Sequence, residues 1–183
     1  MLARFPFKGS GILIGLFFAG MMIPVHCTLI PLYNMMNMAG LIDHLWALLF
    51  PYVASSLPIA VFLTYGHYQQ LPKELEEAAR IDGCSVTGMF FRVFLPLSKP
   101  VISTISILTA LSAWNEFMFA NVFLSDPNQK TLPIGLLALK GTYSTDYAAL
   151  CAALTMSAVP IILVYVLMSN KIQSGMVAGA VKS

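Results

Sequence analysis

Four long apolar runs dominate the pattern of hydrophobic and polar positions along the chain. No charged residue interrupts residues 9–31, 45–66 or 147–170, and only Glu116 interrupts residues 100–124. About 20 apolar residues in a helix are needed to cross the roughly 30 Å hydrocarbon core of a bilayer. We therefore predict four transmembrane helices over these ranges, and an all-α integral membrane protein as the fold class.

The composition agrees with a chain that is buried in lipid. Charged residues make up 10% of the 183 residues, against about 25% in soluble domains, which excludes a water-soluble enzyme because too few polar residues are present to cover a globule. The net charge of +2 is too small for a nucleic-acid surface. The widely spaced Cys27, Cys84 and Cys151 form no disulfide or zinc pattern, so neither metal nor cofactor is expected.

The first apolar run has a second interpretation. Arg4 and Lys8, followed by the apolar residues 9–25, also resemble the start of a secretory signal peptide. The absence of a clean cleavage site, and an apolar stretch that continues through Ile30, favour a transmembrane span.

The basic residues predict how the spans are oriented. With four spans, both termini lie on one side, and that side together with the loop 67–99 collects eight of the ten Lys and Arg residues. Because cytoplasmic segments carry the excess of Lys and Arg, we predict that this side is cytoplasmic and that loops 32–44 and 125–146 face outward. The eight basic residues are Arg4, Lys8, Lys73, Arg80, Arg92, Lys99, Lys171 and Lys182.

The predicted cytoplasmic loop contains the signals for two short helices. Pro72 suits a helix start and Gly83 a helix stop, which predicts a helix over residues 73–82 with acidic side chains in its first turn. Ser85 can cap a second helix over 86–95, which Pro96 would end. On physical grounds alone, an amphipathic connector at the membrane surface explains this pattern equally well.

The same loop carries a spaced motif that resembles a known family. An E-A-A triplet is followed after three residues by G, and after nine more by V-x-L-P. This spacing, with Val in place of the usual Ile, resembles the cytoplasmic coupling loop of binding-protein-dependent ABC transporter permeases. The resemblance implies the MetI-like fold of a type I ABC importer, with a single transmembrane permease domain over residues 1–183. The motif residues are Glu77, Ala78, Ala79, Gly83, Val93, Leu95 and Pro96.

The resemblance extends beyond the loop. Residues 71–83, 114–117, 131–136 and 175–182 are similar to the carbohydrate-uptake branch of these permeases, the maltose-type second subunit. Such permeases usually have six spans, and residues 4–8 resemble the loop before their third span. We therefore expect the first two spans to be absent from this sequence.

The family implies a mode of action and a set of partners. The coupling helix docks into a cytoplasmic ATPase subunit, and ATP-driven closure of the ATPase pair rocks the membrane bundles between two access states. A second permease subunit, forming a heterodimer, and an extracytoplasmic solute-binding protein complete the importer, in a bacterial or archaeal cytoplasmic membrane. The chain has no G-x-x-x-x-G-K-[ST] motif, so ATP hydrolysis is assigned to a separate chain.

Eight residues of this chain are implied as the ATPase-docking site. By the resemblance, Glu77 pairs with a basic residue of the ATPase, Ala78 and Ala79 permit close approach, and Gly83 sets the docking angle. The full set is Glu77, Ala78, Ala79, Arg80, Asp82, Gly83, Leu95 and Pro96.

Glu116 marks a candidate substrate pathway. A carboxylate inside a span costs about 2.5–3.5 kcal/mol, and Asn115 and Trp114 beside it offer an amide and a flat face for a sugar ring. The alternative is that Glu116 is structural and pairs with Lys130 or with another helix.

The expected substrate is a sugar, with glycerol 3-phosphate or another polyol as the alternative within the same branch. Two other classes are weighed against it. An intramembrane enzyme needs converging catalytic groups, and an ion-coupled carrier needs several ionisable residues within its spans. One carboxylate and the scattered histidines His26 and His67 supply neither.

Overall fold

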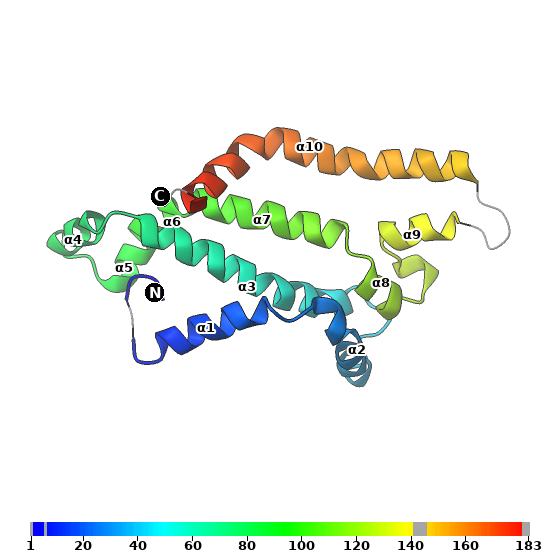
Figure 1. The fold of residues 1–183 in the computed structure, drawn as a ribbon, viewed down its shortest axis with the longest axis horizontal. Helices are drawn as coiled ribbons and strands as arrows, with labels where there is room; N and C mark the ends of the chain where they lie inside the picture. Colours follow the sequence, from blue (N-terminus) through cyan, green and yellow to red (C-terminus); the bar gives the residue numbers. More distant parts are fainter. Residues whose placement is uncertain (1, 6, 141–145, 181–183) are drawn as a thin grey trace. The chain divides into compact units, whose positions relative to one another are not determined.

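The computed structural model describes residues 2–5, 7–140 and 146–180, with side chains up to residue 166 except residue 138. Its regular elements are helices (Figure 1). The tail resemblance includes Val181 and Lys182, and the orientation argument also uses Lys182. Both residues lie outside the described residues. The longer helices are α1 (Ser10–Gly20), α2 (Leu29–Met38), α3 (Trp46–Gln70), α4 (Glu74–Ile81), α7 (Lys99–Trp114), α8 (Met118–Phe123), α9 (Leu132–Ala138) and α10 (Tyr147–Ala180). Shorter segments are a 3-10 turn at Val25–Thr28, α5 (Val86–Met89), a π-helical segment at Phe90–Phe94, α6 (Leu95–Leu97) and a 3-10 turn at Pro127–Gln129.

The chain forms two compact units. Unit 1 comprises residues 1–21, 58–108 and 168–183, and unit 2 comprises residues 22–57 and 109–167. The division falls inside α3, α7 and α10, so each of these helices contributes residues to both units.

Two of the predicted spans are confirmed as continuous helices. The predicted span 45–66 forms α3, and the span 147–170 forms α10, which continues to Ala180. Over the described residues, Trp46–Gln70 and Tyr147–Val166 are long and apolar enough to cross a membrane. Their side chains are apolar around most of the helix surface, as expected for helices surrounded by lipid and by other helices.

The prediction of one continuous helix over residues 9–31 is wrong. The chain leaves the helix after Gly20 and becomes helical again at Val25, with Pro24 in an extended conformation between them. Proline has no N–H to donate and disfavours helical geometry in the residue before it, which explains the break.

The prediction of one helix over residues 100–124 is wrong as well. α7 ends at Trp114, and α8 begins at Met118. The side-chain amide of Asn115 donates to the carbonyl of Leu111 at 2.8 Å and shares it with the Asn115 backbone N–H. The next N–H, of Glu116, donates to Ala113 only three residues earlier, at 3.4 Å, where the helix ends. The described residues contain two further bent pairs of helices, Ser10–Gly20 with Val25–Met38 and Val86–Leu97 with Lys99–Trp114. If each bent pair counts as one span, the described residues contain four candidate spans.

Unit 2 is held together by a buried apolar cluster. Its members come from α2, from the start of α3, and from α8 with the residues around it, and one comes from α9. The Phe119 and Phe123 rings meet edge to face, with their centroids 5.6 Å apart. The buried residues are Met36, Ala47, Leu48, Phe119, Ala120, Phe123, Leu124 and Ile134.

Asp43 ties two segments of unit 2 together. Its backbone has a φ of 63°, in the left-handed region that Asp tolerates better than most residues. Its N–H donates to the carbonyl of Phe123 at 2.9 Å, and its carboxylate accepts from the N–H groups of Ser125 and Asp126, the latter at 2.9 Å. These two backbone hydrogen bonds, Asp126 first, lower the pKa of the Asp43 carboxyl below its usual range.

We predict that Asp43→Asn lowers the thermal stability of the protein in detergent at neutral pH, because it removes the charge but keeps the backbone conformation. The Asp43 contribution is complete above the unfolded pKa of about 3.9 and is lost as the pH falls through the lower folded pKa. The difference in Tm between the two proteins should therefore shrink in acid. The exposed Asp82→Asn is the control; an equal loss there, or a pH-independent difference at Asp43, would contradict the assignment.

Candidate functional site

The described residues contain two separate candidate sites, and the first is the short helix α4 in unit 1. It spans Glu74–Ile81, within one residue of the predicted 73–82 at each end. Gly83, with a φ of 76°, ends the helix in a turn where the N–H of Cys84 donates to the carbonyl of Ala79 at 2.9 Å. Only glycine takes this left-handed conformation without strain, so the predicted helix stop is confirmed.

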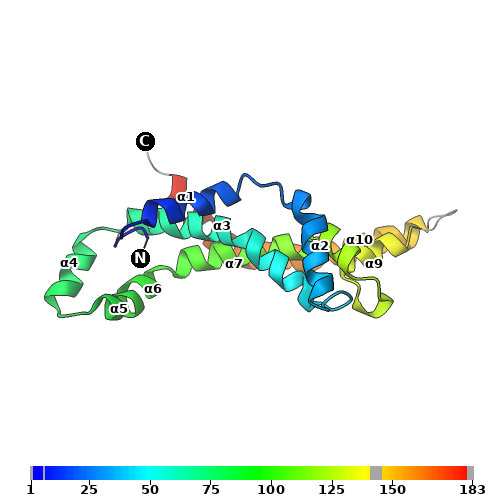
Figure 2. The ribbon, with the colours of Figure 1, turned by 90° about the horizontal axis from the view of Figure 1, so that it is seen from below.

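The second short helix of this loop is longer than predicted. Ser85 caps it, and its side chain accepts from the N–H of Gly88 at 3.1 Å. The helical path then continues through the π-helical segment Phe90–Phe94 to Leu97. Pro96 does not end it, because Pro96 lies in the first turn of α6, where an N–H has no intrahelical partner to lose. In both views α4 and α5 follow one another beyond the end of α3 (Figure 1 and Figure 2).

Ser98 forms the joint between this helical path and α7. The two axes meet there at 65°. Ser98 is 1% exposed, and its Oγ lies 2.6 Å from both the Phe94 carbonyl and the Tyr68 hydroxyl. A hydroxyl has one proton, so Ser98 donates to the carbonyl and accepts from Tyr68. The joint is thereby fixed to the end of α3.

Most of the predicted docking residues are exposed. The exception is Ala79, which is 5% exposed and packs against Met89 and Phe94 inside unit 1. Its small side chain therefore lets α4 pack closely against Met89 and Phe94 of the same chain, and its methyl group does not lie on the outer face of α4. Sequence reasoning missed Ile81, which is 86% exposed on the same short helix. The exposed members are Glu77, Ala78, Arg80, Asp82, Gly83, Leu95 and Pro96.

Arg4 anchors α4 to the end of α3, and sequence reasoning counted it only as a topology signal. Its guanidinium donates from Nε to the Tyr68 carbonyl at 2.6 Å and from Nη2 to the Leu71 carbonyl. Its Nη1 lies 3.3 Å from Oε1 of Glu76, and the two side chains are 9% and 13% exposed. One buried cation thus donates hydrogen bonds to carbonyls at the end of one helix and forms an ion pair with a carboxylate on the next.

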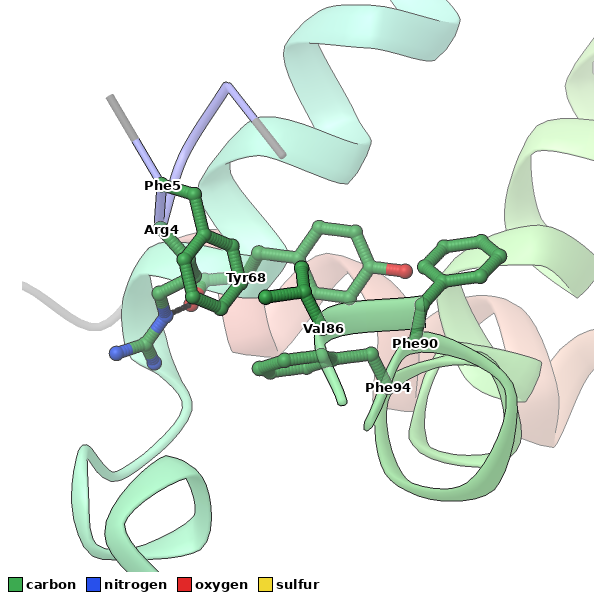
Figure 3. A pocket seen from close by; sticks show the side chains of 6 residues that line it. All are labelled: Arg4, Phe5, Tyr68, Val86, Phe90 and Phe94. Atoms are coloured by element: carbon green, nitrogen blue, oxygen red, sulfur yellow. Dashed lines mark hydrogen bonds between the residues drawn. The ribbon is translucent and has the colours of Figure 1, made fainter. Parts of the chain in front are cut away.

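Aromatic side chains form the packing under this anchor. Phe5 and Tyr68 each meet Phe94 edge to face, with centroid distances of 6.5 and 5.6 Å. Figure 3 shows these three rings close together, with Val86 among them. Arg4, Phe5, α3, α5 and the π-helical segment therefore form one packed support for α4.

The second candidate site is a cavity of about 160 Å³ in unit 2. Glu116 lines it, whereas Trp114 and Asn115 do not. Of the three predicted pathway residues, only Glu116 therefore lines this cavity. The other polar lining residues are His26, Tyr52, Ser55, Ser56, Thr109 and Ser112.

The carboxylate of Glu116 lies in the break between α7 and α8. It accepts from the Tyr52 hydroxyl at 2.7 Å and from the N–H groups of Phe119 and Ala120 at 2.8 and 3.1 Å. The partner that another helix provides for Glu116 is therefore Tyr52, and not the Lys130 named in the sequence analysis. Glu116 therefore satisfies the first amides of α8 and ties α8 to α3, which offsets the cost of placing a carboxylate there.

One sequence signal pointed to the remaining cavity residues and was not used. Tyr52, Ser55 and Ser56 are spaced by three and four residues, as are Thr109, Ser112 and Ala113, so each set shares a helix face. Polar side chains repeated on one face of an apolar helix indicate a polar space beside it. Among the described residues, no group of three or more His, Cys, Asp and Glu gathers closely enough to hold a metal ion.

Comparisons with known proteins agree with this architecture. Residues 1–174 match the family model of the binding-protein-dependent transport system inner membrane component. The chain is 44% identical over 181 residues to the probable ABC transporter permease protein YurM of Bacillus subtilis, covering 99% of this chain and 60% of that protein. It is 35% identical over 182 residues to the trehalose/maltose transport system permease protein MalG of Thermococcus litoralis, covering 98% and 65%.

A solved structure shares the fold. It is the crystal structure of a bacterial ABC transporter involved in the import of the acidic polysaccharide alginate, with a TM-score of 0.77 and 23% identity, covering 92% of this chain and 64% of that one. The two relatives are permease proteins and not enzymes, and the trehalose/maltose name agrees with the carbohydrate-uptake branch. The chain spans between 60% and 65% of the length of these two relatives.

We predict that Arg4→Ala loosens α4. Removing one partner of a largely buried ion pair costs about 3 kcal/mol or more, which corresponds to about a hundredfold faster hydrogen exchange of the α4 amides. The exposed Arg92→Ala, in the same unit, should leave exchange in α4 unchanged. Equal protection of α4 in the wild type and in Arg4→Ala would show that Arg4 does not anchor this helix.

Proposed function

The chain belongs to the family of binding-protein-dependent transport system inner membrane components, and from this we propose that it is the permease subunit of an ATP-driven importer for a sugar. Alternating access moves the sugar across the cytoplasmic membrane, and ATP is hydrolysed by a separate pair of ATPase chains. The support for the proposal is the match over residues 1–174 and the short exposed helix between α3 and α7.

The single observation that carries the proposal is the exposed face of α4. Ile81 is an apolar side chain that is 86% exposed, and Glu77, Ala78 and Arg80 beside it are exposed as well. An exposed apolar side chain with charged residues around it suits the apolar centre and the polar rim of a protein contact. The buried support below α4 makes it a rigid lever, which suits a helix that has to transmit the closure of an ATPase pair.

The orientation and the partners follow from the same premise. We place α4 and both termini in the cytoplasm, where the ATPase pair has access to Glu77, Ala78, Arg80 and Ile81. A second permease subunit forms a heterodimer with this chain, and an extracytoplasmic solute-binding protein delivers the sugar to the opposite side. The large exposed apolar surface of α1, α3 and α10 suits contact with lipid and with the second subunit.

A sugar is the substrate class that the relatives favour. The relative in Thermococcus litoralis is named for trehalose and maltose, and the solved transporter for the acidic polysaccharide alginate. The hydroxyl-lined cavity of unit 2 suits a hydroxylated substrate. Glycerol 3-phosphate and other polyols are the alternatives within the same machinery.

We predict that Glu77→Lys reduces ATP-dependent sugar uptake by the complete importer to background, because it reverses the charge that meets the ATPase. Uptake of radiolabelled sugar into proteoliposomes measures the effect, and the amount of inserted protein should be unchanged. Glu74→Lys is the matched control, since Glu74 is an exposed residue on the same helix, one turn earlier. Unchanged uptake with Glu77→Lys, or the same loss with Glu74→Lys, would refute the docking assignment.

A further inference from the structure

The cavity of unit 2 gathers polar side chains from separate segments of the chain. His26 comes from the 3-10 turn after Pro24, Tyr52 and Ser55 from α3, Ser112 from α7, and Glu116 from the break before α8. Its volume of about 160 Å³ is more than ten times the roughly 10–15 Å³ that one water requires. The space therefore accommodates a polar ligand of several atoms.

The hydroxyl groups of this lining offer acceptors and donors together. Ser55 and Ser56 both donate to the carbonyl of Tyr52, at 3.2 and 2.7 Å, and each hydroxyl oxygen keeps its capacity to accept. The His26 ring carries at least one N–H donor, and the Ser112 hydroxyl is a donor and an acceptor. Sugar hydroxyls also donate and accept, so this lining matches their chemistry.

The formal charge on the described lining of the cavity is negative. Glu116 is the only Asp, Glu, Lys or Arg among the described residues that line the cavity. Its carboxylate is held in place by Tyr52, Phe119 and Ala120, so it cannot swing away from an anionic ligand without releasing α8. A phosphate, sulfonate or carboxylate entering the cavity would meet this charge without a basic partner from this chain.

We propose that this cavity is a subsite for an uncharged polyhydroxyl ligand, a neutral sugar or polyol, and that Glu116 disfavours anionic substrates there. The inference rests on the proposed transport function and refines its substrate class. It favours neutral sugars over glycerol 3-phosphate.

The charge selectivity is tested without knowing the sugar. In the complete importer, with Cys27, Cys84 and Cys151 of this chain replaced by Ser, Ser112→Cys places one thiol in the cavity. Its reaction rate is measured with a neutral hydroxyethyl and an anionic sulfonatoethyl methanethiosulfonate, each divided by the rate with a free thiol. We expect the anionic reagent to react about fivefold more slowly than the neutral one, the effect of one like charge at contact distance in water.

Two variants test whether the charge of Glu116 causes the difference between the two reaction rates. Glu116→Gln in the same background should bring the two rates together. Ser157→Cys is the control, because Ser157 is a serine on another apolar helix, α10, and lies outside the lining of the cavity; it should show no preference. Equal rates at Ser112→Cys would overturn the proposal, and so would a preference that is the same at Ser157→Cys.

A protection experiment tests the ligand. Maltose, trehalose and diacetylchitobiose serve as neutral probes and glucose 6-phosphate as the anionic probe. At least one neutral probe that the importer takes up should slow modification of Ser112→Cys, and glucose 6-phosphate should not. ATP-dependent sugar uptake without protection would overturn the subsite alone. Absence of ATP-dependent uptake of any saccharide would overturn the proposed function, so the two failures are distinct.

Discussion

Backbone groups that are freed when an apolar helix breaks must find partners inside the protein, because lipid offers none. Glu116 shows how this constraint is met. The chain leaves its helix after Trp114, and the Glu116 carboxylate accepts the first amides of α8 at 2.8 and 3.1 Å while the Tyr52 hydroxyl donates to it. The break thereby becomes a fixed point, and the polar cavity lies beside it. The polar lining of the cavity and the fixed break between α7 and α8 thus depend on the same contacts.

Unit 1 meets the same constraint at the ends of its helices. Arg4 satisfies two carbonyls at the end of α3 and pairs with Glu76 on α4, while Ser85 caps the next helix and Ser98 holds the joint with α7. These groups fill the inner side of the loop, and Ala79 packs there with them. The outer side keeps Glu77, Ala78 and Ile81 exposed. A rigid helix with one free face is suited to transmitting the movement of a partner.

The sequence predicted local features well and long-range contacts poorly. The helix stop at Gly83 and the cap at Ser85 were predicted correctly, because they depend on the conformation and side-chain chemistry of a few neighbouring residues. The two breaks, at Pro24 and after Trp114, were not predicted, because the length of each apolar run was given more weight than the helix-disfavouring residues Pro24 and Asn115 within it. The pairing of Arg4 with Glu76 links residues far apart in sequence, and nothing in the local pattern indicates it. Ala79 was placed on the wrong side because its neighbour Met89 belongs to another helix.

The central claim is that α4 presents its outer face to an ATPase while its inner face is closed by the chain itself. Cysteine cross-linking in the complete importer tests this most directly, with Cys84 replaced by Ser. Ala78→Cys, on the exposed face, should cross-link through a short bifunctional maleimide to a cysteine introduced on the ATPase surface, whereas Ala79→Cys, at a position that is 5% exposed, should not. Cross-linking of both positions to the same extent, or of neither, would contradict the account.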